Sequence, residues 1–250
     1  PMLRRCKKNS FTASALASLE AMYIHTRKPY AIPEFFISPS EFLKNQHRAM
    51  GFDVSRFEVV PNFVDCYLFE PHTKPGDYVL YFGRLSLEKG LEHLIGAFAG
   101  LGNRKLVIAG VGPDEKRLRT LAEKLGAPVH FAGFNTGESL RQLIYQSRFT
   151  IMPSVCYENA PLAILESLAA GKPVIASDIG GIPELITDDI GLLFPPGNTD
   201  AIAETVETLW NDKTRIEDMG EIARRTVEDK YTPEIHLEKI LNIYNRAMKK

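Results

Sequence analysis

The chain has 250 residues, 44% of them hydrophobic and 24% charged, which is the composition of a globular protein with one large domain, or with one domain and part of another. Its 30 basic and 31 acidic residues give a net charge of −1. The overall charge therefore does not attract nucleic acid or an anionic membrane, and any bound anion must be held by a few local groups. The cysteines, Cys6, Cys66 and Cys156, show no CxxC pair or zinc spacing, which argues against a disulfide framework and fits a reducing cytoplasmic compartment.

The start of the chain has no hydrophobic stretch typical of a signal peptide, and its apolar runs are far shorter than the roughly 20 residues of a membrane helix. Because the first residue is Pro1 and not Met, we expect the sequence to be a piece of a longer protein. Residues 4–8 hold four basic side chains, which predict either a solvated basic face or a contact with anionic lipid.

The first 66 residues predict the end of an α/β domain whose beginning is missing. Two strands do not make a stable parallel sheet alone. The segment that follows, residues 70–76, has two prolines and one glycine and is typical of a linker. The predicted elements are helix 10–26, strand 35–38, helix 40–50 and strand 57–60.

From Asp77 onward, short β-branched runs alternate with amphipathic stretches, and two further helices follow Asp212, the last starting at Thr232 and Pro233. This alternation predicts an α/β fold with a doubly wound, Rossmann-like parallel sheet, which places ligands at the carboxyl ends of its strands. The predicted strands are 78–82, 105–109, 129–132, 149–152, 174–177 and 192–194, and the helices between them are 90–100, 113–125, 139–146, 161–170 and 199–210.

A first cluster of polar residues, Phe-Gly-Arg-Leu-Ser-Leu-Glu-Lys-Gly at 82–90, follows the first of these strands. Gly83 allows a tight turn. Arg84 offers a planar fork of donors and Lys89 a mobile point charge, and across a loop both can converge on one diphosphate. The alternative is a pair of solvated surface cations, against which the strand-to-helix position argues.

A second cluster begins at Glu158 and follows the fourth strand. Pro161 suits the first position of a helix, where no N–H is needed. The N–H groups of Leu162 and Ala163 would then point out of the helix end and form an anion site together with the helix dipole. The small side chain of Ala160 would let a ligand approach closely.

Two carboxylates of this cluster are candidates for sugar contacts. Glu166 lies in an apolar stretch, where burying a carboxylate without partners is costly, and a ribose diol could supply two donors to it. The alternative places Glu166 on the solvent face of its helix. Glu158 lies in the loop itself, near the expected position of the distal sugar, or else is an acid that favours the helix dipole.

Further strings complete an ordered set that resembles glycosyltransferase family 4, whose members have the GT-B fold and retain the configuration of the transferred sugar. The resemblance covers about residues 35–231 and rests on the set rather than on any single motif. Besides residues 82–90 and the Glu-x7-Glu spacing, the strings are Ala-Gly-Val-Gly-Pro at 109–113, Val-His-Phe-Ala-Gly-Phe at 129–134, Val-Ile-Ala-Ser-Asp-Ile-Gly-Gly-Ile-Pro-Glu at 174–184 and Gly-Leu-Leu-Phe-Pro-Pro-Gly at 191–197.

The resemblance implies a role for each matching residue. Arg84, Lys89 and Glu158 match the catalytic centre: the two cations bind the donor diphosphate and Glu158 contacts the donor sugar. Glu166 matches the acid that binds the ribose hydroxyls. The remaining donor-binding positions are Gly83, Gly110, Phe134 and Asn135, the latter two beside the base, and Asn159, Ala160, Leu162 and Ala163 beside sugar and phosphate. Many relatives have Gly-Phe-Gly where this chain has Asn-Ala-Pro at 159–161, so the sugar specificity stays open.

The resemblance also implies three regions: residues 1–66 as the remnant of the N-terminal acceptor-side domain, 67–232 as the nucleotide-sugar donor-binding domain, and 233–250 as a C-terminal helix that packs back toward the N-terminal lobe. The expected enzyme is a hexosyltransferase of polysaccharide biosynthesis that transfers sugar from a UDP- or GDP-sugar to a glycan or lipid-linked acceptor. No Asp-x-Asp motif occurs, so we expect neither a metal nor another cofactor.

Several alternatives accompany this interpretation. A nucleotide-sugar epimerase of similar fold would convert the donor without an acceptor, and a donor-binding fragment would be inactive alone. Gly110 and Gly112 begin a GxGxxG pattern, but the sixth position is Glu115, which disfavours a dinucleotide oxidoreductase. We expect a cytoplasmic protein without nucleic-acid partners, with peripheral contact at the inner face of the membrane through the missing lobe as an alternative.

Overall fold

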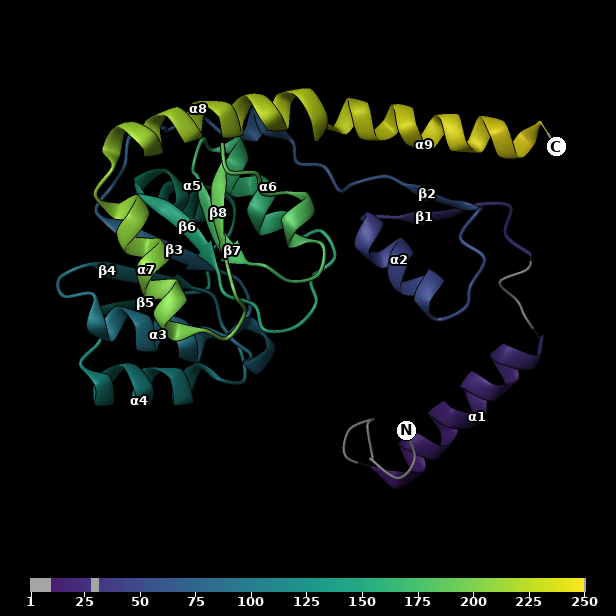
Figure 1. The fold of residues 1–250 in the computed structure, drawn as a ribbon, viewed down its shortest axis with the longest axis horizontal. Coiled ribbons are helices and arrows are strands. Elements are labelled where there is room, and N and C mark those ends of the chain that lie inside the picture. Colours follow the sequence, from purple (N-terminus) through teal and green to yellow (C-terminus); the bar gives the residue numbers. More distant parts are fainter. Residues whose placement is uncertain (1–9, 28–31, 250) are drawn as a thin grey trace.

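The computed structural model describes residues 10–27 and 32–249, and its main domain is built on a six-stranded parallel sheet (Figure 1). The strand order is β5-β4-β3-β6-β7-β8. This confirms the predicted α/β class and parallel sheet. The strands are β3 (Tyr78–Phe82), β4 (Lys105–Ala109), β5 (Val129–Gly133), β6 (Phe149–Met152), β7 (Val174–Ser177) and β8 (Gly191–Phe194).

Each face of this sheet is covered by its own helices and has its own hydrophobic core. Helices α3 (Leu91–Gly100), α4 (Glu115–Leu125) and α7 (Thr199–Trp210) cover one face. Helices α5 (Gly137–Gln146) and α6 (Leu162–Ala169) cover the other, together with the second half of α8 (Lys213–Lys230), whose first half packs Ile216 and Met219 into the first core. Successive side chains of a strand point to opposite faces, so β3 sends Val79 and Tyr81 into the first core and Leu80 and Phe82 into the second.

The central strands β3 and β6 are neighbours, but the chain leaves them in opposite directions. After β3 it enters α3 on one face, and after β6 it enters α6 on the other. The two connections therefore diverge at the carboxyl ends of adjacent strands. This is the topological switch point at which open α/β sheets bind ligands.

The N-terminal part of the chain contributes α1 (Phe11–Arg27), β1 (Phe36–Ser38), α2 (Glu41–Ala49) and β2 (Phe57–Val59), and β1 and β2 pair in parallel. Helix α9 (Pro233–Met248) continues from α8 beyond the main domain and lies beside these strands (Figure 1). Arg246 of α9 forms an ion pair with Glu58 at 2.6 Å, and a ring nitrogen of His236 lies 2.9 Å from the carbonyl oxygen of Pro61.

Several predicted bounds differ from the structure by one or two residues, and two of them have a local cause. Helix α5 begins at Gly137 and not at residue 139, because Thr136 and Ser139 form a capping box. Helix α6 begins at Leu162, because Pro161 keeps an extended ψ of 123° and is the N-cap rather than the first helical residue. The 70–76 segment is held against the main domain, where the N–H of His72 donates to the carbonyl of Ala170 at 2.9 Å.

The division into residues 1–66, 67–232 and 233–250 stays a prediction. The basic residues at 4–8, and with them the lipid contact considered for that stretch, lie outside the described residues. A search of the described helices finds none that is both long and apolar enough to cross a membrane.

The side chain of Lys172 is fully buried at the amino ends of β6 and β7. Its Nζ donates to the carbonyl oxygens of Lys74 at 2.9 Å and of Ser147 at 2.8 Å, so this lysine ties the 70–76 segment to the sheet. Among residues 10–27 and 32–249 it has no carboxylate partner. Burial lowers the pKa of Lys172 to about 8.

Replacing Lys172 with Met tests this burial. Between the folded pKa of about 8 and the ordinary value of 10.5, the unfolded chain holds a proton that the folded chain lacks, so raising the pH favours the folded state. Relative to Lys172→Met, the wild-type free energy of unfolding should therefore rise by about 2 kcal/mol between about pH 7 and about pH 10. Urea unfolding at both pH values measures the difference, and a constant difference would mean that Lys172 keeps its ordinary pKa.

Candidate functional site

The two loops that diverge at the switch point are bonded to each other. The loop after β3 contains a short 3-10 helix, Leu87–Lys89, and the carbonyl of Glu88 accepts the N–H of Val155 from the loop after β6 at 3.0 Å. Below the first loop, the buried hydroxyl of Tyr81 donates to the carbonyl of Arg84 at 2.8 Å. The loop after β3 is thus tied to the sheet through Tyr81 and to residue 155 of the loop after β6.

Lys89 and Glu158 meet across these loops. The Nζ of Lys89 lies 2.5 Å from Oε1 of Glu158, and the two side chains are 24% and 19% exposed. The hydroxyl of Ser154 donates to the same oxygen at 2.8 Å. Sequence reasoning singled out Lys89 and Glu158 separately and missed Ser154, although its place just beyond the carboxyl end of β6 is a signal for a site residue.

Arg84 lies on a different side of the site. It is exposed and lines a cavity of about 300 Å³, and no described residue forms an ion pair with its guanidinium. Arg84 and Lys89 therefore do not share a partner in this state. The cavity is lined by Phe82, Gly83, Arg84, Ala109, Gly110, Val111, Phe134, Asn135 and Leu140, and so contains five of the predicted donor-binding positions.

Backbone geometry shapes this cavity. Gly110 has φ +142°, and a Cβ on it would lie 1.9 Å from the carbonyl oxygen of Gly83, so only glycine fits between the two loops. Across the cavity, Phe134 is 72% exposed. The side-chain amide of Asn135 donates to the carbonyls of Ala132 at 3.1 Å and Gly133 at 3.2 Å, and these bonds fix the loop that carries Phe134.

Glu166 lies at a second cavity of about 310 Å³ next to the first, and Leu140 lines both. Its carboxylate has no hydrogen-bond or ion-pair partner in the described part of the chain. Burial raises the pKa of Glu166 above its ordinary value. Glu166 therefore does not lie on a fully solvated helix face, which was the alternative. Its carboxylate is half-buried, and no described residue donates a hydrogen bond to it.

The start of α6 lies beside Glu166. The N–H groups of Leu162 and Ala163 donate to no carbonyl among the described residues, as expected for the first turn of a helix. Leu162 is 51% exposed and lines the cavity of Glu166, whereas Ala163 is partly buried. The predicted anion-binding helix end is thus open on the side of the cavity.

Ala160 is covered by the chain itself, whereas its neighbour Asn159 is exposed. Ala160 is only 7% exposed, and its carbonyl accepts the side-chain amide of Asn62 at 2.8 Å. The space beside this small residue, expected for a ligand, is therefore closed by the segment that enters the main domain. Sequence reasoning missed Asn62, because its partner is 98 residues away.

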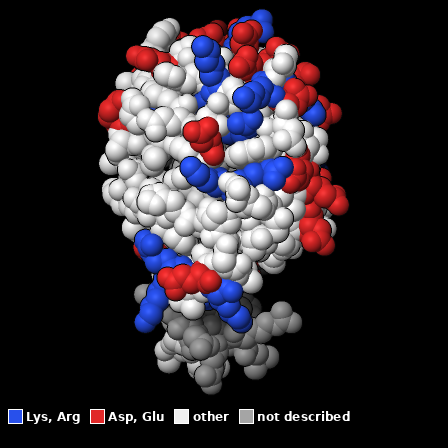
Figure 2. Space-filling view, turned by 90° about the vertical axis from the view of Figure 1, so that its left-hand side faces the viewer, with Lys and Arg blue, Asp and Glu red and all other residues white. Residues whose placement is uncertain are grey.

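The surface charges and the possible metal ligands bear on which ligands the protein could hold. Figure 2 shows Lys and Arg interspersed with Asp and Glu over one face of the molecule, as the net charge of −1 predicts. In the residues that the structure describes, no group of three His, Cys, Asp or Glu side chains could hold a metal ion. The expected metal independence stays a prediction.

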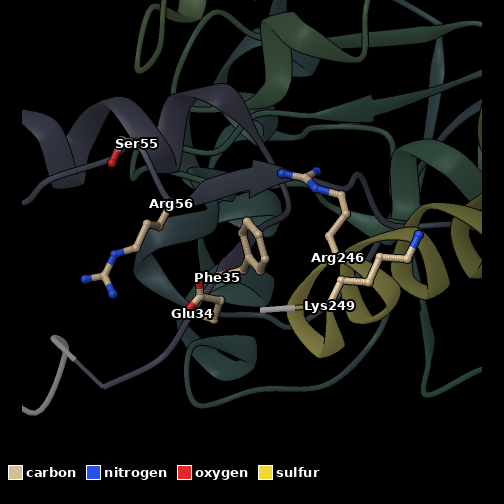
Figure 3. Close-up of a pocket in the computed structure, with 6 residues that line it drawn as sticks. All are labelled: Glu34, Phe35, Ser55, Arg56, Arg246 and Lys249. Carbon is tan, nitrogen blue, oxygen red and sulfur yellow. The ribbon is translucent and has the colours of Figure 1, made fainter.

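A further cavity, of about 510 Å³, lies away from these residues, between the end of α9 and the strands β1 and β2. Figure 3 shows Arg56 on one side of Phe35 and Arg246 and Lys249 on the other. Arg246 pairs with Glu58 and lies 4.8 Å from the ring centre of Phe35, and Arg56 donates to the carbonyl of Pro33 at 2.6 Å. Arg246 thus joins α9 to the N-terminal part, whereas the bond of Arg56 lies within that part.

Comparisons with known proteins match the part of the chain that holds this site. The family model described as Glycosyl transferases group 1 matches residues 69–226. An uncharacterized glycosyltransferase of Methanocaldococcus jannaschii is 36% identical over 176 residues, which cover 68% of this chain and 45% of that protein. The alpha-D-kanosaminyltransferase of Streptomyces kanamyceticus is 35% identical over 173 residues, 66% of this chain and 45% of that protein. The chain thus spans less than half the length of these two relatives.

Solved structures share the fold. Sucrose-phosphate synthase from Thermosynechococcus elongatus superposes with a TM-score of 0.78 at 25% identity, over 85% of this chain and 58% of that one. The Anabaena protein HepE, in complex with UDP and glucose, gives a TM-score of 0.76 at 22% identity, over 87% and 64% of the two chains. With a family model that spans Lys89, Glu158 and Glu166, and a sheet shared with GT-B glycosyltransferases, the chain belongs to the glycosyl transferases group 1 family.

Proposed function

We propose that this chain binds a nucleoside diphosphate sugar at the switch point, and that the whole protein transfers the sugar to an acceptor. One observation carries the proposal. Lys89 and Glu158, from the loops that follow the adjacent strands β3 and β6, meet at 2.5 Å, and α6 begins at Leu162, four residues after Glu158. A cation, a carboxylate and a helix N-terminus thus all follow the carboxyl ends of these two strands, and each suits one part of a sugar phosphate.

The phosphate side of the site supplies positive charge. Departure of a nucleoside diphosphate leaves extra negative charge on its phosphate oxygens, which preorganised donors stabilise. Lys89, Arg84 and the N–H groups of Leu162 and Ala163 are the available donors. Glu158 pairs with Lys89, so a bound diphosphate would replace one anionic partner of this lysine by another.

The opposite end of the ligand would lie along the two joined cavities. Glu166, half-buried and without a partner among described residues, is suited to two hydroxyl donors of a ribose. The exposed ring of Phe134 is available to a base, and Glu158, once released from Lys89, to sugar hydroxyls. The anomeric carbon would then lie between Glu158 and the phosphate donors.

The family resemblance supports further proposals on the donor, the stereochemistry and the acceptor. HepE was crystallised with UDP and glucose, and this supports a UDP-sugar donor, with a GDP-sugar as the alternative. We propose membership of glycosyltransferase family 4, transfer of a hexosyl group with retention and without a metal, and a glycan or lipid-linked acceptor at the cytoplasmic face of a membrane. The curated relatives named above are transferases and give an epimerase no support.

Removing the Lys89 ammonium tests the phosphate site. Lys89→Ala should weaken UDP or GDP binding, measured calorimetrically in the presence of EDTA, by about tenfold or more, because a charge-assisted contact to the diphosphate is lost. Lys105→Ala is the matched control, since Lys105 is exposed at the amino end of β4. Equal affinity of wild type and Lys89→Ala would remove Lys89 from the phosphate site.

The proposed contact between Glu166 and the ribose can be tested by changing the ligand as well as the protein. Wild-type protein should bind the ribonucleotide about tenfold more tightly than its 2′-deoxy analogue, because the half-buried carboxylate loses one of its two hydroxyl donors in the deoxy complex. Glu166→Ala should bind both equally, whereas Glu204→Gln, a change on the exposed side of α7, should discriminate as the wild type does. If Glu166→Ala still discriminated, the ribose contact would lie elsewhere.

A further inference from the structure

The Glu184 carboxylate connects the main domain to the start of α2. Its Oε2 accepts the N–H of Glu41 at 2.8 Å and its Oε1 accepts the N–H of Phe42 at 2.5 Å. These amides belong to the first turn of α2, where a helix has no internal acceptor for them and where its dipole favours a carboxylate. Both oxygens of Glu184 are thus used on a segment more than 140 residues away in the sequence.

The turn that carries Glu184 also packs against the Glu158 loop without space between them. The N–H of Gly181 donates to the carbonyl of Glu158 at 2.7 Å. A Cβ on Gly181 would lie 1.8 Å from the carbonyl oxygen of Asn159 and 3.2 Å from Cβ of Ser40, the N-cap of α2. The turn, the Glu158 loop and the start of α2 therefore form one contact, in which a displacement of one element moves the others.

The N-terminal part reaches the same loop by two other contacts. The ring of Phe42 lies 5.0 Å from that of Tyr157, and Asn62 donates to the carbonyl of Ala160. The loop is thus held on one side by the turn and on the other by residues that precede the main domain. Its position depends on how α2 is docked.

We infer that Glu184 is a positioning residue, whose carboxylate docks α2 and through the turn sets the backbone of residues 157–160. This inference rests on the proposed function only for the role of Glu158 toward the donor sugar. Because Glu184 is exposed, water can replace the two amides, and the docked and undocked arrangements can exchange. Docking therefore acts directly on residues 157–160 at the sugar end of the site, while Arg84 and Lys89 lie on the loop after β3, which Tyr81 ties to the sheet.

Hydrogen exchange of the protein, with Glu184→Gln against the wild type, tests the inference. The glutamine keeps one acceptor oxygen but loses the charge and the second acceptor. Exchange at Glu41 and Phe42 should accelerate about tenfold, and the amide of Gly181, which reports the Glu158 loop, should accelerate with them. The amide signals of Glu41 and Phe42 should also shift, which is a spectroscopic signature of the lost carboxylate. Glu184→Ala should show larger changes in the same places.

The control variant is Asp188→Asn, an exposed acid near the same turn, which should leave all these amides unchanged. UDP affinity should stay within about twofold in every variant, since the phosphate donors are not displaced. Faster exchange at α2 alone, no acceleration, or a uniform acceleration over the main domain would each overturn the positioning role. Failure of the wild type to bind UDP or GDP would instead overturn the proposed function and leave the exchange result valid.

Discussion

The reversal of the sheet order between β3 and β6 is the constraint on which the rest of the site depends. The strands are hydrogen-bonded neighbours, but their helices pack on opposite faces, so no connection crosses the space above their carboxyl ends. The loops beyond these ends carry Lys89 and Glu158, and the loop of the next strand outward, β4, contributes Gly110. The same two hydrophobic cores that stabilise the sheet thereby place cations, a helix end and carboxylates around one crevice.

Within this crevice the charges are arranged so that a ligand can compete for them. A partly exposed ion pair contributes only about 0–1 kcal/mol, because both groups keep some contact with water. The Lys89–Glu158 pair is of this kind, and it keeps both side chains in place at little cost to an incoming diphosphate. Arg84 and Glu166, by contrast, have no partner among the described residues and lie at the two joined cavities. Within the described part of the chain, the crevice thus holds one neutralised ion pair, one cation without an ion-pair partner at the first cavity and one such acid at the second.

The sequence predicts the local parts of this arrangement better than the distant ones. Strands such as β3 and β6 are short, mostly apolar runs that end at Gly83 and Pro153, and the loops beyond them lie at the carboxyl edge, so Lys89 and Glu158 could be named in advance. Asn62 and Glu184 could not, because their partners are 98 and 143 residues away and a backbone carbonyl or amide leaves no trace in the sequence. The burial of Lys172 could not be predicted for the same reason, since both of its acceptors are backbone carbonyl oxygens.

The distribution of contacts from the N-terminal part has a mechanical meaning. Phe42 and Asn62 both touch the loop of residues 157–160, and Glu184 meets α2 directly behind it, whereas Arg84 and the 3-10 helix Leu87–Lys89 are held by hydrogen bonds within the main domain. A movement between the two parts would therefore act first on residues 157–160 and reach Arg84 and the 3-10 helix only through the contacts between the two loops. Under the proposed function, a nucleotide could then bind before the two parts dock, and docking would complete the sugar contacts.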